Sequence, residues 1–414
     1  MSKTSIFRAG ALAAFLALSA AGLVLVAVPG DAVAQSKDGW RKELAEKAQQ
    51  AQAAGQKGNY SEAIRLLKEA KAKAPLSAQE EQGINELMIW AASGAKDHKL
   101  VLATVDERLA TGRITGADLT RKLRLKATTH YALRDYRNAA ATFEKLAAQG
   151  ALTADDLTLL ATSQMQLRDY GKATGTLEKA IAANDKAGRG AKNVALLEML
   201  NSAYFETKND VKRMQVLHRL MAVAPKASTF KQLASAYEVA SAKDPVVMVN
   251  VYRLGATKNV LSNEHFAKYA ETALDLSSPG EAVAMLEKGM AAGAIKKDDR
   301  NTRLLADAKS QVERVKATLP QQEKEAQAIQ TGEPEAKLAT AYFTVKNYAK
   351  ASEAARRAVT KGNLKRPDDV NMLLGISLAN GKKAADAKKA FTAAAASNNG
   401  KTRGIADLWS SLTG

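Results

Sequence analysis

The sequence contains no cysteine among its 414 residues. A chain without thiols has no disulfide framework, no thiolate metal site and no attachment point for a lipoprotein anchor. The fold must therefore be held by its apolar core alone, and the chain is long enough to bury one.

Residue patterns that perform catalysis are also missing. The sequence shows neither a Gly-x-Ser-x-Gly nucleophile elbow nor a Gly-x4-Gly-Lys-Ser/Thr phosphate loop. Paired aspartates such as Asp155-Asp156 are expected at helix starts, where the helix dipole stabilises an anion. We therefore predict that the protein is not an enzyme, with no catalytic residue, no metal site and no cofactor. The histidines lack the spacing of metal ligands; they are His98, His130, His218 and His265.

The first 34 residues have the layout of a secretory signal. Lys3 and Arg8 precede an apolar run over residues 9–28, and Pro29-Gly30 and Ala32-Val33-Ala34 follow it. This order predicts a signal peptide over residues 1–34 that is cleaved after Ala34. About 20 apolar residues also suffice to cross a bilayer, so an uncleaved membrane anchor is the alternative. We expect a periplasmic or secreted protein of a bacterial envelope.

Acidic residues are fewer than basic ones: the sequence has 43 Asp and Glu against 61 Lys and Arg, for a formal net charge of +18. Behind a signal sequence, this balance indicates an anionic envelope surface as a partner, such as a membrane or an acidic cell-wall polymer. We expect no nucleic acid partner. The alternative is that the basic side chains only solvate a long helical surface.

One segment is repeated in the sequence with a period of 34 residues, since residues 135–143 are echoed by residues 169–177. An internal repeat of this period predicts stacked pairs of helices. Within each copy a small residue, Ala139 or Ala173, lies four residues before a large one, Phe143 or Leu177, on the same helical face. The small residues let two helices approach closely, and the large ones fill the space beside them.

These patterns resemble the tetratricopeptide repeat (TPR), a family of 34-residue helix–turn–helix units. Eight units are recognisable in the sequence, and two further intervals, residues 78–117 and 297–331, each have the length of one degenerate unit. The resemblance implies an all-α fold, a right-handed α-solenoid of about 8–10 stacked antiparallel helix pairs over residues 35–397. Such an array leaves no room for a separate catalytic domain.

The last residues, 398–414, are expected to form a separate helix, because Ile405, Leu408, Trp409 and Leu412 follow amphipathic spacing. This helix either caps the last repeat or docks into a partner. Residues 185–192 are expected to form an exposed loop between two units, and Gly332-Glu333-Pro334 to mark a boundary.

In the TPR family, residues of the first helix of each pair line a concave groove that binds extended peptides. The resemblance therefore implies a non-enzymatic scaffold in the cell envelope with a protein or peptide partner. The alternatives are a basic structural protein that binds anionic cell-wall polymer or membrane, and a membrane-tethered assembly factor if the signal is uncleaved. We expect Arg121, Arg124 and Tyr131 to hold a carboxylate or phosphate. The positions that match the groove are Arg121, Arg124, Thr128, Tyr131, Glu198, Ser202, Phe205, Lys231, Ser235, Glu238, Lys268, Glu271, Lys337, Thr340 and Phe343.

Overall fold

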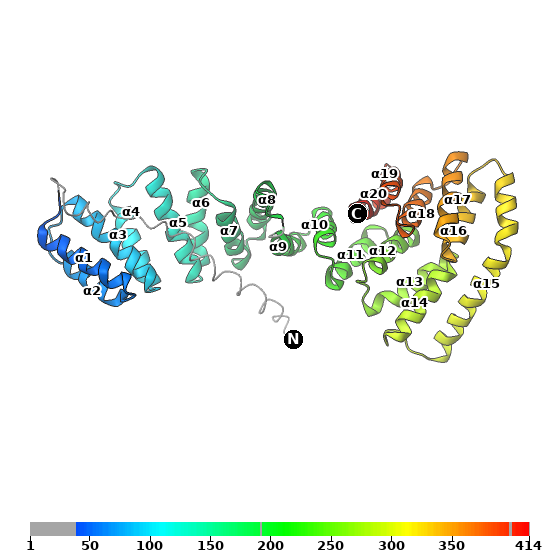
Figure 1. Ribbon diagram of the computed structural model, residues 1–414, viewed down its shortest axis with the longest axis horizontal. Coiled ribbons are helices and arrows are strands. Elements are labelled where there is room, and N and C mark those ends of the chain that lie inside the picture. The colour runs from blue at the N-terminus through cyan, green and yellow to red at the C-terminus, as the bar shows by residue number, and fades with distance from the viewer. Residues whose placement is uncertain (1–38, 191–192, 397–399, 414) are drawn as a thin grey trace. The chain divides into compact units, whose positions relative to one another are not determined.

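The structure, a computed structural model, describes residues 39–190, 193–396 and 400–413. Over these ranges the chain forms twenty helices and no strand (Figure 1). The all-α fold of stacked helix pairs is thereby confirmed. None of these helices is both long and apolar enough to cross a bilayer. The predicted signal peptide lies outside the described residues.

The chain divides into two compact units, residues 1–163 (unit 1) and 164–414 (unit 2). In each unit we call the first helix of a pair the A helix, the second the B helix, and the connection between them the A/B turn. The boundary lies inside α7. Unit 1 contains α1 (Lys42–Gln56), α2 (Tyr60–Lys71), α3 (Ala78–Gly94), α4 (His98–Ala110), α5 (Gly116–Ala132), α6 (Tyr136–Ala148) and most of α7 (Ala154–Gln166).

Unit 2 holds the remaining helices, in which A and B helices alternate with one exception described below. Its first pairs are built by α9 with α10, α11 with α12, and α13 with α14. The helices are α8 (Tyr170–Lys186), α9 (Asn193–Glu206), α10 (Asp210–Val223), α11 (Ala227–Ala240), α12 (Pro245–Thr257), α13 (Asn263–Asp275), α14 (Pro279–Ala291), α15 (Asp299–Ala328), α16 (Glu333–Thr344), α17 (Tyr348–Lys361), α18 (Pro367–Asn380), α19 (Ala384–Ala395) and α20 (Gly400–Leu412).

The A/B turn is short because one residue both closes the A helix and opens the B helix. The backbone amide of Asp135 donates to the carbonyl of His130, 2.9 Å away, which closes α5. The side chain of Asp135 accepts a hydrogen bond from the amide of Asn138 and so caps α6. Asp169 does the same at the echoed position in unit 2. The 34-residue echo in the sequence is thus a repeated turn.

Small residues pack the helices of a pair as the pattern predicts. Ala139 and Phe143 of α6 are fully buried, as are Ala63 and Leu67 of α2. The degenerate interval at residues 78–117 also forms a helix pair, α3 with α4, as expected from its length.

The second degenerate interval does not form a pair, and this prediction is wrong. Residues 299–328 make one continuous helix of 30 residues, α15. The segment is rich in Ala, Lys, Glu and Gln, which favour helix, and it contains no glycine that would end one. Pro320 does not stop it, because Pro320 is exposed and water can satisfy the carbonyl that its missing N–H leaves free.

The expected loop at residues 185–192 is shorter than predicted. Asp185 and Lys186 belong to the last turn of α8, and residues 191–192 lie outside the described ranges. The Asp185 carboxylate is held by Asn193 at 2.6 Å and by Arg219 at 2.6 Å. These two bonds explain why the helix continues through a residue that the sequence assigns to a loop.

Helix α20 closes unit 2. Its apolar residues Ile405, Leu408 and Trp409 are buried, and it packs against α18 and α19 and also against α10 and α12. The indole nitrogen of Trp409 donates to the carbonyl of Asn250, 3.1 Å away. The predicted amphipathic face is therefore buried inside the unit. It joins the last repeat to the second and third B helices of unit 2.

Candidate binding surfaces

The groove residues expected on α5 have partners within unit 1. Arg124 donates to the carboxylate of Asp156 at 2.9 Å and to the carbonyl of Ala151 at 2.7 Å, so its guanidinium joins α5 to the start of α7. Arg121 is exposed and pairs with Asp118 one turn earlier. Arg124 therefore serves as a strut between helices, and Arg121 is the more accessible cation.

Thr128 and Tyr131 complete the predicted patch on α5. The Thr128 hydroxyl donates to backbone carbonyls of its own helix. The ring of Tyr131 lies edge-on to that of Tyr136, with ring centres 5.7 Å apart. Burial raises the pKa of Tyr131, and a hydrogen bond with Thr162 opposes the shift. Tyr131 thus remains protonated at neutral pH and offers a ring face and a hydroxyl.

In unit 2, the predicted groove residues lie on three successive A helices, α9, α11 and α13, and their charges are paired across helices. Lys231 of α11 lies 3.0 Å from Glu264 of α13, and Lys268 of α13 lies 2.6 Å from Glu238 of α11. We call this surface the A-helix row. Its members are Glu198, Ser202, Phe205, Lys231, Ser235, Glu238, Lys268 and Glu271.

Phe205 is the large apolar side chain of the A-helix row. It is 59% exposed, and the guanidinium of Arg213 lies 4.9 Å from its ring centre. A stacked cation of this kind holds the ring in one orientation while leaving its other face open. Ser202 and Ser235 are small and leave space along the row. The row can therefore contact an apolar side chain and the polar backbone of a bound segment.

The predicted groove does not continue from α13 to α16, because the single helix α15 lies between α14 and α16 in place of a pair. Lys337 is exposed and Thr340 is half-buried. Phe343 is buried and packs under the guanidinium of Arg253, which lies 4.7 Å from its ring centre. Phe343 was expected on an open surface, and this expectation is wrong, because α16 turns that face into the core of unit 2.

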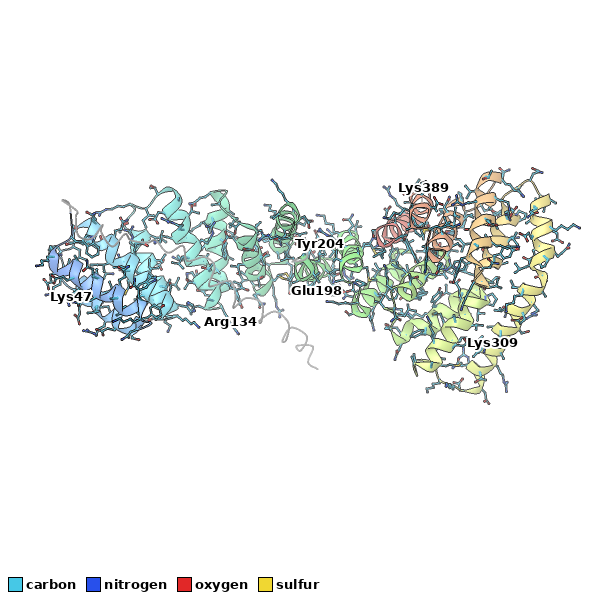
Figure 2. The ribbon with its side chains drawn as sticks, viewed as in Figure 1. Lys47, Arg134, Glu198, Tyr204, Lys309 and Lys389 are labelled. Carbon is cyan, nitrogen blue, oxygen red and sulfur yellow. The ribbon has the colours of Figure 1, made fainter. Side chains whose placement is uncertain are left out.

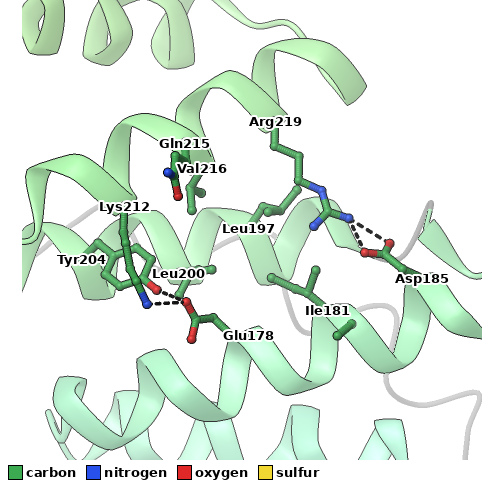
Figure 3. A pocket seen from close by; sticks show the side chains of 11 residues that line it. Glu178, Ile181, Asp185, Leu197, Leu200, Tyr204, Lys212, Gln215, Val216 and Arg219 are labelled. Carbon is green, nitrogen blue, oxygen red and sulfur yellow. Dashed lines mark hydrogen bonds and ion pairs between the residues drawn. The ribbon is translucent and has the colours of Figure 1, made fainter. Parts of the chain in front are cut away.

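A pocket that the sequence did not indicate lies between α8, α9 and α10 (Figure 3). Its volume is about 250 Å³, below the range of pockets for drug-sized molecules. Two ion pairs bound it: Lys212 with Glu178 at 2.9 Å, and Arg219 with Asp185 at 2.6 Å. The pocket can accept one apolar side chain between two charged pairs. Its apolar lining is formed by Ile181, Leu197, Leu200 and Val216.

Tyr204 is tied to one end of this pocket. Its hydroxyl donates to the carboxylate of Glu178, which also accepts from Lys212. Burial and the Glu178 carboxylate raise the pKa of Tyr204 to about 12, while the hydroxyl and the ammonium lower the pKa of Glu178. The phenol is therefore a fixed donor and not a base.

A signal for this pocket was present in the sequence. Glu178 and Lys212 are 34 residues apart, and so are Asp185 and Arg219. Residues one repeat length apart occupy equivalent positions on successive B helices. Opposite charges at this spacing therefore predict a salt bridge between those two helices. A groove lined by A helices does not include them, because both pairs join the B helices α8 and α10.

The interior of unit 2 contains a buried ion pair. Arg253 of α12 and Glu281 of α14, with side chains only 10% and 11% exposed, join through contacts of 2.9 and 2.6 Å. Glu281 also accepts from Tyr269 at 2.6 Å and from Ser278 at 2.8 Å. Burial alone would raise the pKa of Glu281, but the charge of Arg253 and these hydrogen bonds hold it below its usual value. The donors therefore keep Glu281 ionised.

A second polar group lies where the starts of α12 and α18 meet. Arg366 pairs with Asp369 and lies 3.7 Å from Asp244. Burial and the nearby carboxylates of Asp368 and Asp244 raise the pKa of Asp369 to about 7. These carboxylates belong to the internal contact that closes the unit. Within the described residues no group of His, Asp or Glu has the arrangement of a metal site.

Comparisons with known proteins find only distant structural similarity. No protein-family model matches the sequence, and no curated protein matches it. Among solved structures, the Naa15/Naa10 complex bound to HypK-THB matches with 18% identity and a TM-score of 0.38, over 85% of this chain and 53% of that chain. The protein thus spans about half the length of that matched chain.

Two further similar structures are tetratricopeptide repeat proteins. One, from Parabacteroides merdae, has 14% identity and a TM-score of 0.35, over 65% of this chain and 99% of its own. The other, the TPR2AB domain of yeast Sti1 in a pHSP90 complex, has 14% identity and a TM-score of 0.25, over 72% of this chain and 100% of its own. Scores of this size say nothing about binding sites. The repeat assignment rests on the protein's own helix pairs and A/B turns.

Proposed function

We propose that this protein is a non-enzymatic scaffold of TPR type that binds an extended protein segment along the A-helix row of unit 2. The observation that carries the proposal is the open surface of α9, α11 and α13. There, exposed side chains are held in place by ion pairs between neighbouring helices. A surface that is ordered before binding loses less entropy when a partner arrives.

The chemistry of the row favours a protein segment. Phe205 supplies an aromatic anchor of the type that dominates protein interfaces. Lys231, Glu238 and Lys268 present both signs of charge within one surface, which suits a peptide of mixed polarity better than a uniformly charged polymer. In unit 1, Arg121 and Tyr131 lie about 15 Å apart along α5, so they do not form one site. We propose the exposed Arg121 alone as a contact for a carboxylate.

A photo-crosslinking residue at Ser235 tests the proposed row, because Ser235 is exposed on its middle helix. The matched control is the same residue at Lys179, which is exposed on the B helix α8. We expect a protein adduct in the native envelope from Ser235 and none from Lys179. Phe205→Ala should weaken capture at Ser235 about tenfold. Equal adducts from both positions, or capture that survives Phe205→Ala unchanged, would remove the A-helix row as the site.

We further propose that the protein acts in a bacterial envelope after export. The support is the layout of residues 1–34. Mass spectrometry of the mature N-terminus tests this point. A chain that starts at Gln35 supports a released periplasmic or secreted protein, whereas an intact N-terminus supports the membrane-tethered alternative.

A further inference from the structure

The two ends of the helix pairs use different residues for the same backbone conformation. Where B helices end, the left-handed position is most often occupied by glycine, as at Gly112, Gly150 and Gly293, with φ between 65° and 69° for these three; Asn259 is an exception. At the A/B turns, apart from those with Gly58 and Ser277, a positive φ is adopted by basic residues. These are Lys96 (φ 57°), Arg134 (φ 59°), Arg168 (φ 59°), Lys208 (φ 55°), Lys243 (φ 60°), Lys346 (φ 61°) and Lys382 (φ 60°).

The backbone does not require these basic side chains. A residue with a Cβ atom is strained in the left-handed region, and glycine is not. The chain uses glycine at the opposite ends of its pairs, so glycine was available for this geometry. Repeated Lys and Arg at a position that disfavours them indicates that the charge itself has a role.

The basic side chains at the A/B turns point to solvent. Lys96, Arg134, Arg168, Lys208 and Lys346 are all exposed. None of the five makes an ion pair within the part of the chain that the structure describes. Figure 2 shows Arg134 at an end of the pair α5 and α6. These cations are therefore free to meet an external anion.

Exposed apolar side chains gather at the same turns. The described residues contain eight large hydrophobic side chains that are exposed, and five of them lie within four residues of a left-handed Lys or Arg. Val211 is 74% exposed and Val239 is 82% exposed. An exposed apolar residue needs no explanation singly, but a recurrence at one end of successive pairs does. The five are Leu133, Leu167, Phe205, Val211 and Val239.

Neighbouring repeats place these turns on one edge of each unit. In unit 2, Glu178 pairs with Lys212 and Asp185 with Arg219, so α8 and α10 run side by side in the same direction. In unit 1, Arg124 meets Asp156 and Tyr131 meets Thr162, so α5 and α7 are also parallel. Parallel A helices and parallel B helices bring successive A/B turns to the same edge, which we call the turn edge.

We infer that the turn edge of unit 2 is a contact surface for an anionic membrane. Lys and Arg side chains would pair with headgroup phosphates, and the adjacent Leu and Val side chains would enter the boundary of the acyl chains. The apolar side chains favour a bilayer over a linear polyanion, because a polyanion offers nothing for them to enter. The surface is separate from the proposed protein-binding row, apart from Phe205, which lies at the end of both.

Neighbouring acidic residues do not neutralise the positive charge of the turn edge. The carboxylates of Asp135 and Asp169 accept hydrogen bonds from the amides at the starts of α6 and α8, where the helix dipole offsets their charge. At the turn between α9 and α10, Glu206 and Asp210 reduce the net charge. There Val211 provides the apolar contact.

Site-specific labelling tests the apolar part of the inference. Because the chain has no cysteine, one introduced cysteine carries a unique fluorescent label. Val211 and Val223 are exposed valines at opposite ends of α10, 74% and 53% exposed, so they form a matched pair. With vesicles of phosphatidylglycerol and phosphatidylcholine, a label at V211C should be quenched by brominated lipid. A label at V223C should not.

The charged part is tested by Arg168→Gly combined with Lys208→Gly, which both lie in unit 2, as Val211 does. These substitutions relieve the strained positions, so the fold should be retained, as circular dichroism and thermal unfolding can check. Quenching at V211C should then require at least tenfold more anionic lipid, from the loss of two cations near the surface. The control removes Lys179 and Lys186, exposed residues of α8 in the same unit, and should leave binding within about twofold.

Three outcomes would overturn the inference. Equal quenching at V211C and V223C would show that the edge has no special contact with lipid. Equal binding to pure phosphatidylcholine would show that the charges have no role. Binding to soluble polyphosphate without quenching by lipid would assign the edge to a polyanion instead. Crosslinking at Ser235 should be unaffected by the two glycine substitutions, so failure of this inference and failure of the proposed protein-binding row are separable.

Discussion

The two units are built from the same helix pairs and the same A/B turns, yet they bury their apolar side chains differently. In unit 1 these side chains gather in small local groups, such as Leu44, Ala70 and Ile84 across α1 to α3. In unit 2 one cluster extends from Leu217 in α10 to Trp409 in α20. A repeat pattern therefore specifies contacts between neighbours, and a separate set of contacts decides whether a stack stays open or closes.

Helices α15 and α20 account for this difference. Because α15 is a single helix, the pairs that follow it pack back against α12 and α14. The amide of Gly280 donates to Thr344 at 2.7 Å, and Phe343 packs on Arg253. Helix α12 is consequently buried on nearly every side, which is unusual for the second helix of a pair. Unit 1 has no corresponding helix among its described residues.

The largest effect is expected from Trp409→Ala, which removes the side chain that joins α20 to α12. Trp409 is 2% exposed, and its ring stacks on Phe391 with centres 5.6 Å apart. Truncation of such a residue should lower the free energy of unfolding of unit 2 by about 3–5 kcal/mol. The other two tryptophans, Trp40 and Trp90, lie in unit 1, so fluorescence of the variant reports that unit alone.

Denaturant unfolding followed by circular dichroism should therefore show an early transition for unit 2 in this variant. Tryptophan fluorescence should show an unchanged transition for unit 1. A parallel shift of the fluorescence transition would mean that the units unfold together, and the comparison between an open and a closed unit would lose its energetic meaning.

A smaller effect is expected from Glu281→Gln, which leaves Arg253 charged and buried without a carboxylate. Breaking one side of a buried ion pair costs about 3 kcal/mol. The control is Glu287→Gln, which breaks the surface pair with Lys309 in the same unit and should cost less than about 1 kcal/mol. Thermal unfolding of both variants measures the difference. Equal losses of stability in the two variants would show that water screens the Arg253–Glu281 pair as well as it screens a surface pair.

A pH experiment probes unit 1, where helices are joined by ion pairs at their starts. Arg41 donates to Glu80 at 3.1 Å and lowers the pKa of that carboxyl from its usual 4.5 to about 2. A lowered pKa means that the stabilisation is present above pH 4.5 and is lost as the pH falls toward 2. Because Arg41 is 49% exposed, water screens the pair and the effect should be smaller than that of the buried pair.

Trp40 and Trp90 both lie in unit 1, so in a Trp409→Phe background their fluorescence during acid titration measures the stability of unit 1. Glu80→Gln should lower that stability at neutral pH and flatten its dependence between pH 4.5 and 2. An unchanged titration in this variant would assign the acid sensitivity of unit 1 to other carboxylates.

The repeat in the sequence was sufficient to predict the helix pairs, their packing faces and the A/B turns. Ala139 and Phe143 lie where the pattern places them, because contacts within one pair depend on residues close in sequence. The course of the chain at α15 was not predictable in this way. The failure of residues 297–331 to make a turn reflects weak local preferences, namely no glycine and many helix formers.

The candidate surfaces were predicted less well than the pairs. Exposed positions such as Lys231 and Ser235 follow from helical phase alone. The burial of Phe343 depends on a contact with Arg253, 90 residues away, which no local pattern encodes. The left-handed Lys and Arg residues could have been recognised from the two Arg-Asp-Tyr tripeptides and the similar Lys-Asn-Tyr tripeptide at residues 346–348, but φ values were needed to show that glycine would suit the position better.

The smallest change in stability is expected from substitutions at the left-handed positions of the turns. This change should be the same in both units, because it depends on the local backbone and not on how the helices pack. Arg134→Gly in unit 1 and Lys346→Gly in unit 2 each relieve a strained left-handed residue while adding flexibility to the unfolded chain. Each should raise stability by no more than about 1 kcal/mol. Gly150→Arg in unit 1 and Gly293→Arg in unit 2 introduce the strain and should cost about 1 kcal/mol each, with open space around both positions. If the units respond equally to these four changes but unequally to Trp409→Ala, then their difference lies in packing. Unequal responses at the turns would show that closure of unit 2 also alters the conformation of its connections.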